Sequence, residues 1–237
     1  MLTWQQDHLH SLSLKSDLST AFLDFEVAAR ELGFDFCCYG LRTPFPISRP
    51  RYYVCNNFSS EWDKKYRVNN YWVIDPIVLH AERSVAPIIW STETFSSAMD
   101  LWAEYQLHGL RYGWSQPTHD RRGFVGWLSL ARSVGELTQA EVDIHKFMLS
   151  WLAQTVHVEM SRQLVPRLEP LAEVKLSPRE REVLLWTAEG KTTNDIGTIL
   201  ALSDRTVNFH ITNAMTKLCA SNKTSAAIKG AMLGLLY

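Results

Sequence analysis

The first two thirds of the chain alternate between helical and extended hydrophobic patterns. Apolar residues recur every three or four positions across residues 16–32, which predicts a helix that ends at Gly33. The same spacing recurs in residues 91–108 and predicts another helix. The apolar face of this second helix comprises Phe95, Met99, Trp102 and Leu107.

Segments rich in aromatic and β-branched residues predict strands between the helices. The last two strands flank a charged turn at residues 119–123, which predicts a hairpin. Strands joined by hairpins and interspersed with helices favour an α+β fold, here an α-β-α sandwich with an antiparallel sheet. The predicted strands are residues 34–41, 51–57, 87–90, 112–117 and 123–131, and the other predicted helices are residues 59–66 and 138–163.

Thr138 and Glu141 form a predicted capping box at the start of the last of these helices. The two prolines of residues 166–170 are expected to break this helix and to begin a linker. We therefore expect an N-terminal domain at residues 1–165, a linker at residues 166–174 and a second domain at residues 175–237.

The second domain reads as a helix-turn-helix. Ser177 and Glu180 form a capping box around Pro178, and Gly190 is suited to end the helix that they start. A short second helix is predicted at residues 194–201, with Ile196, Ile199 and Leu200 inward, and Ser203 can cap a third helix at residues 204–218. The predicted buried stripe of the third helix comprises Val207, Ile211, Ala214, Met215 and Leu218. This pattern predicts an all-α domain.

The opposite face of the third helix carries side chains that can read DNA. It presents Arg205, Asn208, Thr212 and Thr216. Asparagine can bind adenine through two hydrogen bonds, and threonine can contact a base, while Arg205, Lys191 and Lys223 can neutralise phosphates. The alternative is a helical module that packs against protein, with its cations simply solvated.

Composition and charge agree with two intracellular domains. The chain has 237 residues, 46% of them hydrophobic, and nine tryptophans, enough for a substantial core. Residues 175–237 hold eight Lys/Arg and five Asp/Glu, which gives +3, so residues 1–174 carry 16 − 20 = −4. The basic excess lies where DNA is expected, and its modest size favours binding as a dimer.

Several classes of protein are not expected. Cys37, Cys38, Cys55 and Cys219 lack metal-binding spacing and favour reduced thiols in a cytosol. Residues 1–10 lack a signal-peptide pattern, and no apolar run approaches a membrane span. The chain has neither a Gly-x-Ser-x-Gly elbow nor a His-x-x-x-His pair. We expect a cytoplasmic protein that is not an enzyme and that needs no metal or cofactor.

Residues 175–237 resemble the DNA-binding domain of the LuxR and FixJ families of bacterial transcription factors. The resemblance rests on Glu180, Leu184, Gly190, Thr206, Val207, His210, Lys217 and Leu218. It implies that the third helix enters the major groove and that a fourth helix, residues 223–236, pairs two copies through Ala227, Ala231 and Leu235. The DNA-binding residues that we predict are Lys191, Thr192, Thr193, Arg205, Thr206, Asn208, Phe209, Thr212, Asn222 and Lys223. Many relatives have a basic residue where this chain has Asn208, so the bases that it reads are left open.

Residues between Phe34 and Trp127 are unusually rich in aromatic side chains. Such side chains can form an ordinary core or line a cavity for an apolar ligand, and spacing alone favours a core. Asp75, which precedes Pro76 and an apolar helical run, is on the same grounds an ordinary helix cap.

Residues 1–165 resemble the acyl-homoserine lactone binding domain of LuxR-type quorum-sensing receptors. Trp62, Tyr66, Asp75, Pro76, Trp90 and Gly113 match six recurrent positions. The chain is most similar to the orphan receptors represented by QscR, through residues 43–46, 74–78, 108–111 and the Gly-Leu-Leu ending. The resemblance implies a ligand-responsive regulator that binds an inverted-repeat operator as a homodimer and contacts RNA polymerase.

The lactone offers a ring carbonyl, an amide N–H, an amide carbonyl and an apolar tail. The resemblance implies that the Trp62 indole donates to the ring carbonyl, that Asp75 accepts from the amide N–H, and that Ser129 donates to the amide carbonyl. Many relatives have a tyrosine at Phe58, and the QscR-like subset often has a serine at Cys38, so a solo receptor for a non-lactone apolar signal is the alternative. The complete predicted ligand set is Trp62, Tyr66, Asp75, Trp90, Ser129, Phe58, Cys38, Trp102 and Gly113.

Overall fold

The computed structural model describes residues 4, 8 and 17–237 and divides into two compact units. The first contains the residues up to His119 together with Phe124–Leu164, and the second contains Asp120–Gly123 together with Val165–Tyr237. The predicted helix start at residue 16 and most of residues 1–10 lie outside the described residues.

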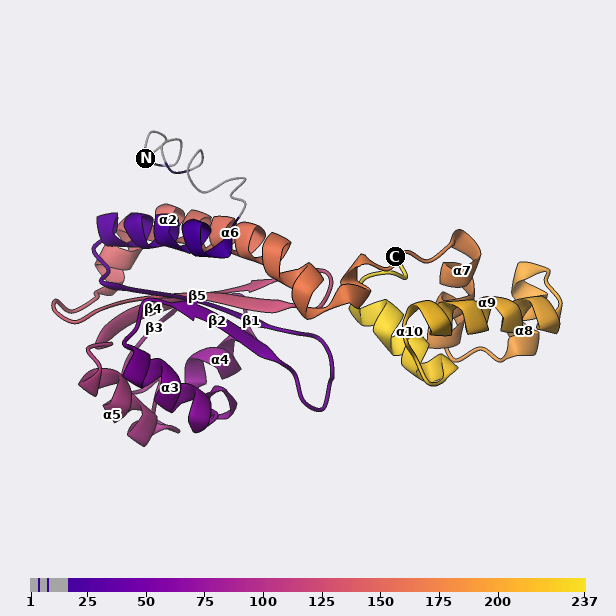
Figure 1. The fold of residues 1–237 in the computed structure, drawn as a ribbon, viewed down its shortest axis with the longest axis horizontal. Helices are drawn as coiled ribbons and strands as arrows, with labels where there is room; N and C mark the ends of the chain where they lie inside the picture. Colours follow the sequence, from indigo (N-terminus) through magenta and orange to yellow (C-terminus); the bar gives the residue numbers. More distant parts are fainter. Residues whose placement is uncertain (1–3, 5–7, 9–16) are drawn as a thin grey trace. The chain divides into compact units, whose positions relative to one another are not determined.

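A five-stranded antiparallel sheet forms the centre of the first unit (Figure 1). Its strand order is β2-β1-β5-β4-β3, in which β4 and β5 form the predicted hairpin and β5 pairs with β1. This arrangement confirms the predicted α+β class. The strands are β1 (Phe36–Arg42), β2 (Tyr52–Asn56), β3 (Ile88–Ile89), β4 (Tyr112–His119) and β5 (Val125–Arg132).

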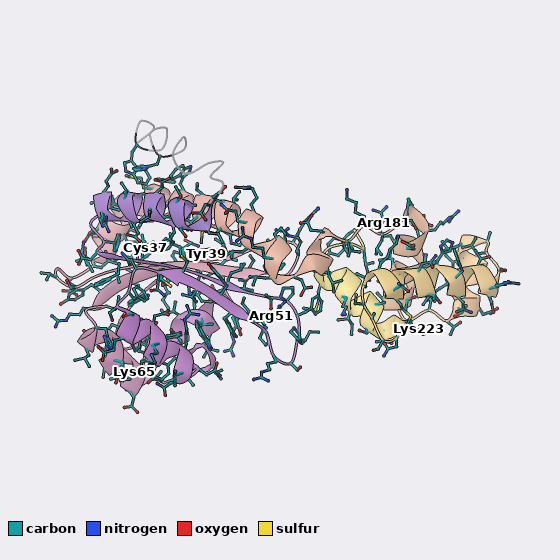
Figure 2. The ribbon with its side chains drawn as sticks, viewed as in Figure 1. Cys37, Tyr39, Arg51, Lys65, Arg181 and Lys223 are labelled. Atoms are coloured by element: carbon teal, nitrogen blue, oxygen red, sulfur yellow. The ribbon has the colours of Figure 1, made fainter. Side chains whose placement is uncertain are left out.

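Helices cover both faces of this sheet. Helices α2 and α6 lie on one face, and α3, α4 and α5 lie on the other (Figure 1). Cys37 and Tyr39 of β1 are buried on the side of α2 and α6, where the Tyr39 hydroxyl lies 3.0 Å from Nδ1 of His157 in α6 (Figure 2). The elements are α2 (Leu18–Glu31), α3 (Ser60–Val68), η1 (Tyr71–Val73), α4 (Pro76–Ala81), α5 (Met99–Leu107) and α6 (Gln139–Leu168).

The predicted helix at residues 91–108 is wrong in its first half. The segment before α5 forms turns, in which the Ser91 hydroxyl accepts from the Thr94 N–H and the Thr94 hydroxyl donates to the Ile89 carbonyl. Such local hydrogen bonds compete with the helical ones. Met99 and Leu107 are consequently 48% and 77% exposed rather than part of the buried face.

Helix α6 also differs from its predicted form at both ends. The Thr138 hydroxyl accepts from the Glu141 N–H, but the Glu141 carboxylate binds Arg132 at 2.7 Å, so the capping box is incomplete. At the other end the helix continues through Pro166, which it was expected to stop at. A proline removes one ladder hydrogen bond, but Leu164 and Val165 before it are buried and the Glu169 N–H after it donates to the Val165 carbonyl at 2.8 Å.

The second unit consists of η2 and four helices, as predicted. Ser177 with Glu180 and Thr192 with Asp195 form complete capping boxes, and Gly190 has the predicted positive φ of 80°. Val183, Ile196, Val207 and Ile211 form the centre of its core. The elements are η2 (Pro170–Glu173), α7 (Pro178–Ala188), α8 (Thr193–Leu200), α9 (Asp204–Lys217) and α10 (Lys223–Met232).

Three details of this unit were predicted wrongly. Ile199 is 44% exposed and does not face inward. Helix α10 ends at Met232, four residues early. Ala227 is only 5% exposed, because it packs inside its own unit and cannot belong to an open pairing surface.

Across the described residues, no helix is both long and apolar enough to cross a membrane.

Glu180 connects the first and third helices of this unit. Its carboxylate accepts from the Ser177 N–H at 2.8 Å and from the Lys217 ammonium at 2.7 Å. Burial disfavours the charged form, but the Lys217 and Ser177 donors outweigh burial and lower the pKa of Glu180.

We predict that Glu180→Gln weakens the second unit by about 1–3 kcal/mol near neutral pH, because a charge-assisted pair is lost. A carboxyl with a lowered pKa stabilises the fold above its unfolded pKa, and that contribution disappears as the pH falls through the folded pKa. The difference should therefore shrink in acid. Hydrogen exchange of peptides from α7 and α9 measures it, with Glu182→Gln as control, because Glu182 lies on the same helix, is half-exposed and pairs only locally with Arg179. Equal loss in both variants at neutral pH would contradict the assignment.

Candidate functional site

The face of the sheet covered by α3, α4 and α5 contains a cavity with a largely aromatic lining. Seven of the nine predicted ligand residues line it, which places them together but does not test their roles. The lining residues that were predicted are Cys38, Phe58, Trp62, Tyr66, Asp75, Trp90 and Ser129. Lining residues that sequence reasoning missed include Trp72, Tyr105 and Trp127.

Asp75 is the carboxylate of this cavity. Its side chain caps α4, because Oδ1 accepts from the Ile77 N–H at 2.8 Å, so the helix-cap interpretation is correct. Oδ2 also accepts hydrogen bonds from the Tyr66 hydroxyl at 2.5 Å and the Tyr105 hydroxyl at 2.6 Å. Asp75 is 1% exposed, and burial raises its pKa although these donors oppose the shift.

A row of polar side chains crosses the sheet, and two of them, Cys38 and Ser129, line the cavity. Cys38, Ser129 and Ser115 lie directly opposite one another on β1, β5 and β4. The Trp90 indole N–H donates to the Ser115 hydroxyl at 2.8 Å, and the hydroxyls of Ser115 and Ser129 are 2.7 Å apart. The Trp90 indole can only donate, so the Ser115 oxygen accepts from it and the Ser115 hydroxyl can donate a hydrogen bond to Ser129. The Ser129 hydroxyl can then donate to a ligand in the cavity. Burial raises the pKa of Cys38, so its thiol stays protonated.

Two tryptophans lie against glycines of the sheet. A Cβ at Gly113 would come within 2.2 Å of the Trp90 ring, and one at Gly40 within 2.1 Å of the Trp127 ring. Gly113 is therefore a platform for Trp90 rather than a residue that lines the cavity. The chain needs glycine there because any side chain would displace an aromatic wall.

Trp102 was predicted to contact ligand but lies elsewhere. Its ring stacks on Phe95 at 4.5 Å and faces a separate, open depression that Trp90 also borders. Trp62, by contrast, is 1% exposed, with its ring edge against Tyr105 at 5.3 Å and its face near His108 at 4.9 Å.

The residues that were missed carry a weak sequence signal. Ala98, the residue before α5, and Leu101 and Tyr105 of α5 are buried at intervals of three and four, a pattern that differs from the predicted face of Phe95, Met99, Trp102 and Leu107. The pairing of Ser115 with Ser129 depends on strand register, which no local pattern reveals. Trp72 stacks on Tyr52 at 5.6 Å beside the cavity, with Arg67 5.8 Å from its ring.

The predicted DNA-binding residues lie on or beside α9 of the second unit. Lys191, Arg205, Asn208, Thr212 and Lys223 are exposed, and Phe209 is 60% exposed. In the described part of the chain, Lys191, Arg205 and Lys223 form no ion pair, which leaves their charges available for phosphate. Lys223 begins α10 (Figure 2).

Several polar side chains there already have local partners. Thr212 donates to the Asn208 carbonyl at 2.9 Å, so it can offer a base its oxygen and methyl group rather than a free proton. Thr192 and Asn222 cap α8 and α10, while Thr206 bonds Ser203. Thr193 lies 3.5 Å from Oδ1 of Asn208, which leaves the Asn208 amide group free to donate.

A buried aromatic cavity in one unit and an exposed, cation-flanked helix of a helix-turn-helix in the other define a ligand-sensing transcription regulator. Comparison with known proteins agrees: residues 18–160 match the family model "Autoinducer binding domain", and residues 174–229 match "Bacterial regulatory proteins, luxR family". The chain belongs to the LuxR family of quorum-sensing regulators.

Its relatives support this assignment over the full length. The transcriptional activator protein AnoR of Acinetobacter nosocomialis is 38% identical and covers 100% of both chains. The crystal structure of Escherichia coli SdiA has a TM-score of 0.87 at 30% identity and covers 100% of this chain and 99% of its own. SdiA in complex with octanoyl-rac-glycerol gives 0.86 at 29% identity, with 100% and 96% covered. These relatives are regulators and not enzymes, as expected.

We predict that Gly113→Ala lowers the free energy of unfolding by about 1–3 kcal/mol, because the new methyl group must push Trp90 aside. Thermal denaturation measures the loss, and combining the change with Trp90→Phe should recover part of it. A variant as stable as the wild type would show that Trp90 does not need this glycine.

Proposed function

We propose that this regulator binds an N-acyl-homoserine lactone in the Asp75 cavity and, as a homodimer, an inverted-repeat operator through α9. The observation that carries the proposal is the placement of an acceptor, Asp75, and a donor, Ser129, on different walls of one aromatic cavity. The N–H and C=O of a trans amide point in opposite directions, so one amide can meet both.

The remaining contacts follow from the chemistry of the ligand. The Trp62 indole suits the ring carbonyl as a donor, while Tyr66 and Trp90 enclose the ring and the start of the chain. The amide N–H would form a charge-assisted hydrogen bond with Asp75, a stronger contact than a neutral one. No metal or cofactor has a part in this proposal.

A second candidate is an acyl ligand without an amide. SdiA in complex with octanoyl-rac-glycerol is similar to this chain, and Phe58 and Cys38 offer the cavity no strong donor. An acyl ester supplies a carbonyl for Ser129 and needs less from Asp75. This ligand class would also suit a receptor that has no partner synthase.

DNA binding rests on the charge and shape of the second unit. Its net charge of +3 is small for tight binding by one copy, and two copies double the number of phosphate contacts. Two-fold symmetry in the protein then predicts two-fold symmetry in the site. Recruitment of RNA polymerase and a cytoplasmic location complete the proposal.

We predict that Asp75→Asn lowers lactone affinity about tenfold or more, because the single Asn oxygen takes over the cap of α4 and its NH₂ group then faces the ligand N–H, which leaves that N–H without an acceptor. The Asn oxygen can still cap α4, so the fold should survive. The ligand-induced shift in melting temperature measures the effect, with Asp100→Asn on the exposed side of α5 as control. Equal shifts in wild type and Asp75→Asn would leave Asp75 a helix cap and nothing more.

We predict that base readers and phosphate contacts in the second unit fail differently. Asn208→Ala should cost about 1–3 kcal/mol on the preferred sequence and little on random DNA, with preference relaxed at one position of each half-site. Lys223→Ala should weaken binding to both and reduce the salt dependence by about one charge per copy.

Selection of random duplexes at two salt concentrations tests both variants against the wild type. The preferred site should be an inverted repeat. If Asn208→Ala returns the wild-type sequence preference, Arg205 or Thr212 must carry the specificity.

A further inference from the structure

The acceptor that the ligand amide needs is already occupied in the protein itself. Four groups meet Asp75: the Ile77 and Val78 N–H groups at the start of α4, with Ile77 on Oδ1, and the Tyr66 and Tyr105 hydroxyls on Oδ2. A carboxylate oxygen has two lone pairs, so the two tyrosines fill Oδ2. An entering N–H must therefore crowd the cap of α4 or displace a tyrosine.

The two tyrosines are held differently. Tyr66 belongs to α3, which Ser59 caps and which an Asp63–Arg67 ion pair braces at 2.8 Å. Tyr105 belongs to α5, which has no side-chain cap and follows the turns of residues 91–98. The start of α5 therefore has fewer local restraints than the start of α3, although Glu104, next to Tyr105, also pairs with Lys65 of α3 at 2.7 Å.

The Tyr105 hydroxyl also lies near a second oxygen. It interacts with the Tyr66 hydroxyl, whose oxygen has lone pairs that can accept, as well as donating to Asp75. Tyr105 can turn to Tyr66 while Tyr66 keeps its bond to the carboxylate, so no buried hydroxyl is left unpaired. Its ring can stay packed between Trp62 and Trp90, at centroid distances of 5.3 and 5.2 Å.

We propose that Tyr105 is a specificity-determining residue whose hydroxyl competes with a ligand N–H for Asp75. The N–H of an acyl lactone then gains one hydrogen bond to the carboxylate at the expense of another, and its contribution to affinity nearly cancels. An acyl lactone ester, which has no N–H, leaves the Tyr105 bond in place. The cavity accepts amide and ester ligands almost equally as a result. This inference rests on the proposed lactone site and identifies the ligand class that the site admits.

The test compares ligands with and without the amide N–H in proteins with and without the Tyr105 hydroxyl. Lactones with short, medium and long acyl chains are titrated against the purified full-length protein, and the tightest is paired with its ester analogue, in which oxygen replaces the amide N–H. Both ligands are then titrated against wild type, Tyr105→Phe and Tyr112→Phe. Tyr112 is a half-buried tyrosine of β4 outside the cavity and controls for loss of a hydroxyl.

We expect similar affinities for amide and ester in the wild type and in Tyr112→Phe. In Tyr105→Phe the amide should bind about tenfold or more tighter than the ester, the factor that an uncontested charge-assisted hydrogen bond supplies. The affinity for the ester should stay at the wild-type value.

Several results would overturn the inference. If the wild type already binds the amide about tenfold tighter than the ester, no hydroxyl competes for Asp75. This result needs only the wild type, so it decides the question even if Tyr105→Phe does not fold. Equal weakening of both ligands by Tyr105→Phe would make Tyr105 a ligand donor. If no acyl lactone binds the wild type, the proposed lactone site is wrong and this inference is wrong with it. If lactones bind but Tyr105→Phe does not favour the amide over the ester, only this inference is wrong.

Discussion

One buried carboxylate, that of Asp75, holds together the half of the ligand domain that encloses the cavity. It caps α4 and accepts hydroxyl protons from α3 and α5, so three separate segments meet at a group that is 1% exposed. Outside the cavity, the neighbouring residues Lys65 and Glu104 join α3 to α5 at 2.7 Å. Burying a charge is costly unless it is paired or hydrogen-bonded, and two hydroxyls and two backbone N–H groups offset that cost here. The shape of the cavity therefore depends on the same atoms that a ligand must approach.

Local signals predicted the elements whose hydrogen bonds close within a few residues. The Ser177–Glu180 box, the stop at Gly190 and the hairpin between β4 and β5 are all where the sequence indicates. The family resemblance predicted that Cys38, Trp62 and Ser129 share one site, which their spacing alone does not predict, and all three line the same cavity. Their roles toward a ligand remain proposals.

The errors arise where distant partners outweigh a local pattern. The Glu141 carboxylate accepts from Arg132 of β5 instead of completing its capping box, and Ala227 is buried by the rest of its unit. Ser115 matters only because strand register sets it opposite Ser129, and Tyr105 only because α5 turns it toward Asp75. A single sequence contains neither register nor helix placement, so these residues could be found only in three dimensions.

If the Asp75 cavity binds a small acyl ligand, the purified protein carries that ligand, and its identity can be measured. The protein is purified from cells that make a mixture of acyl-homoserine lactones, extracted with solvent, and its extract analysed by mass spectrometry beside that of a variant with the cavity filled, Ser129→Trp. We predict one acyl lactone, or its ester counterpart, at close to one per chain in the wild type and none in the variant. An empty wild type, or the same molecule at the same level in both proteins, would contradict it.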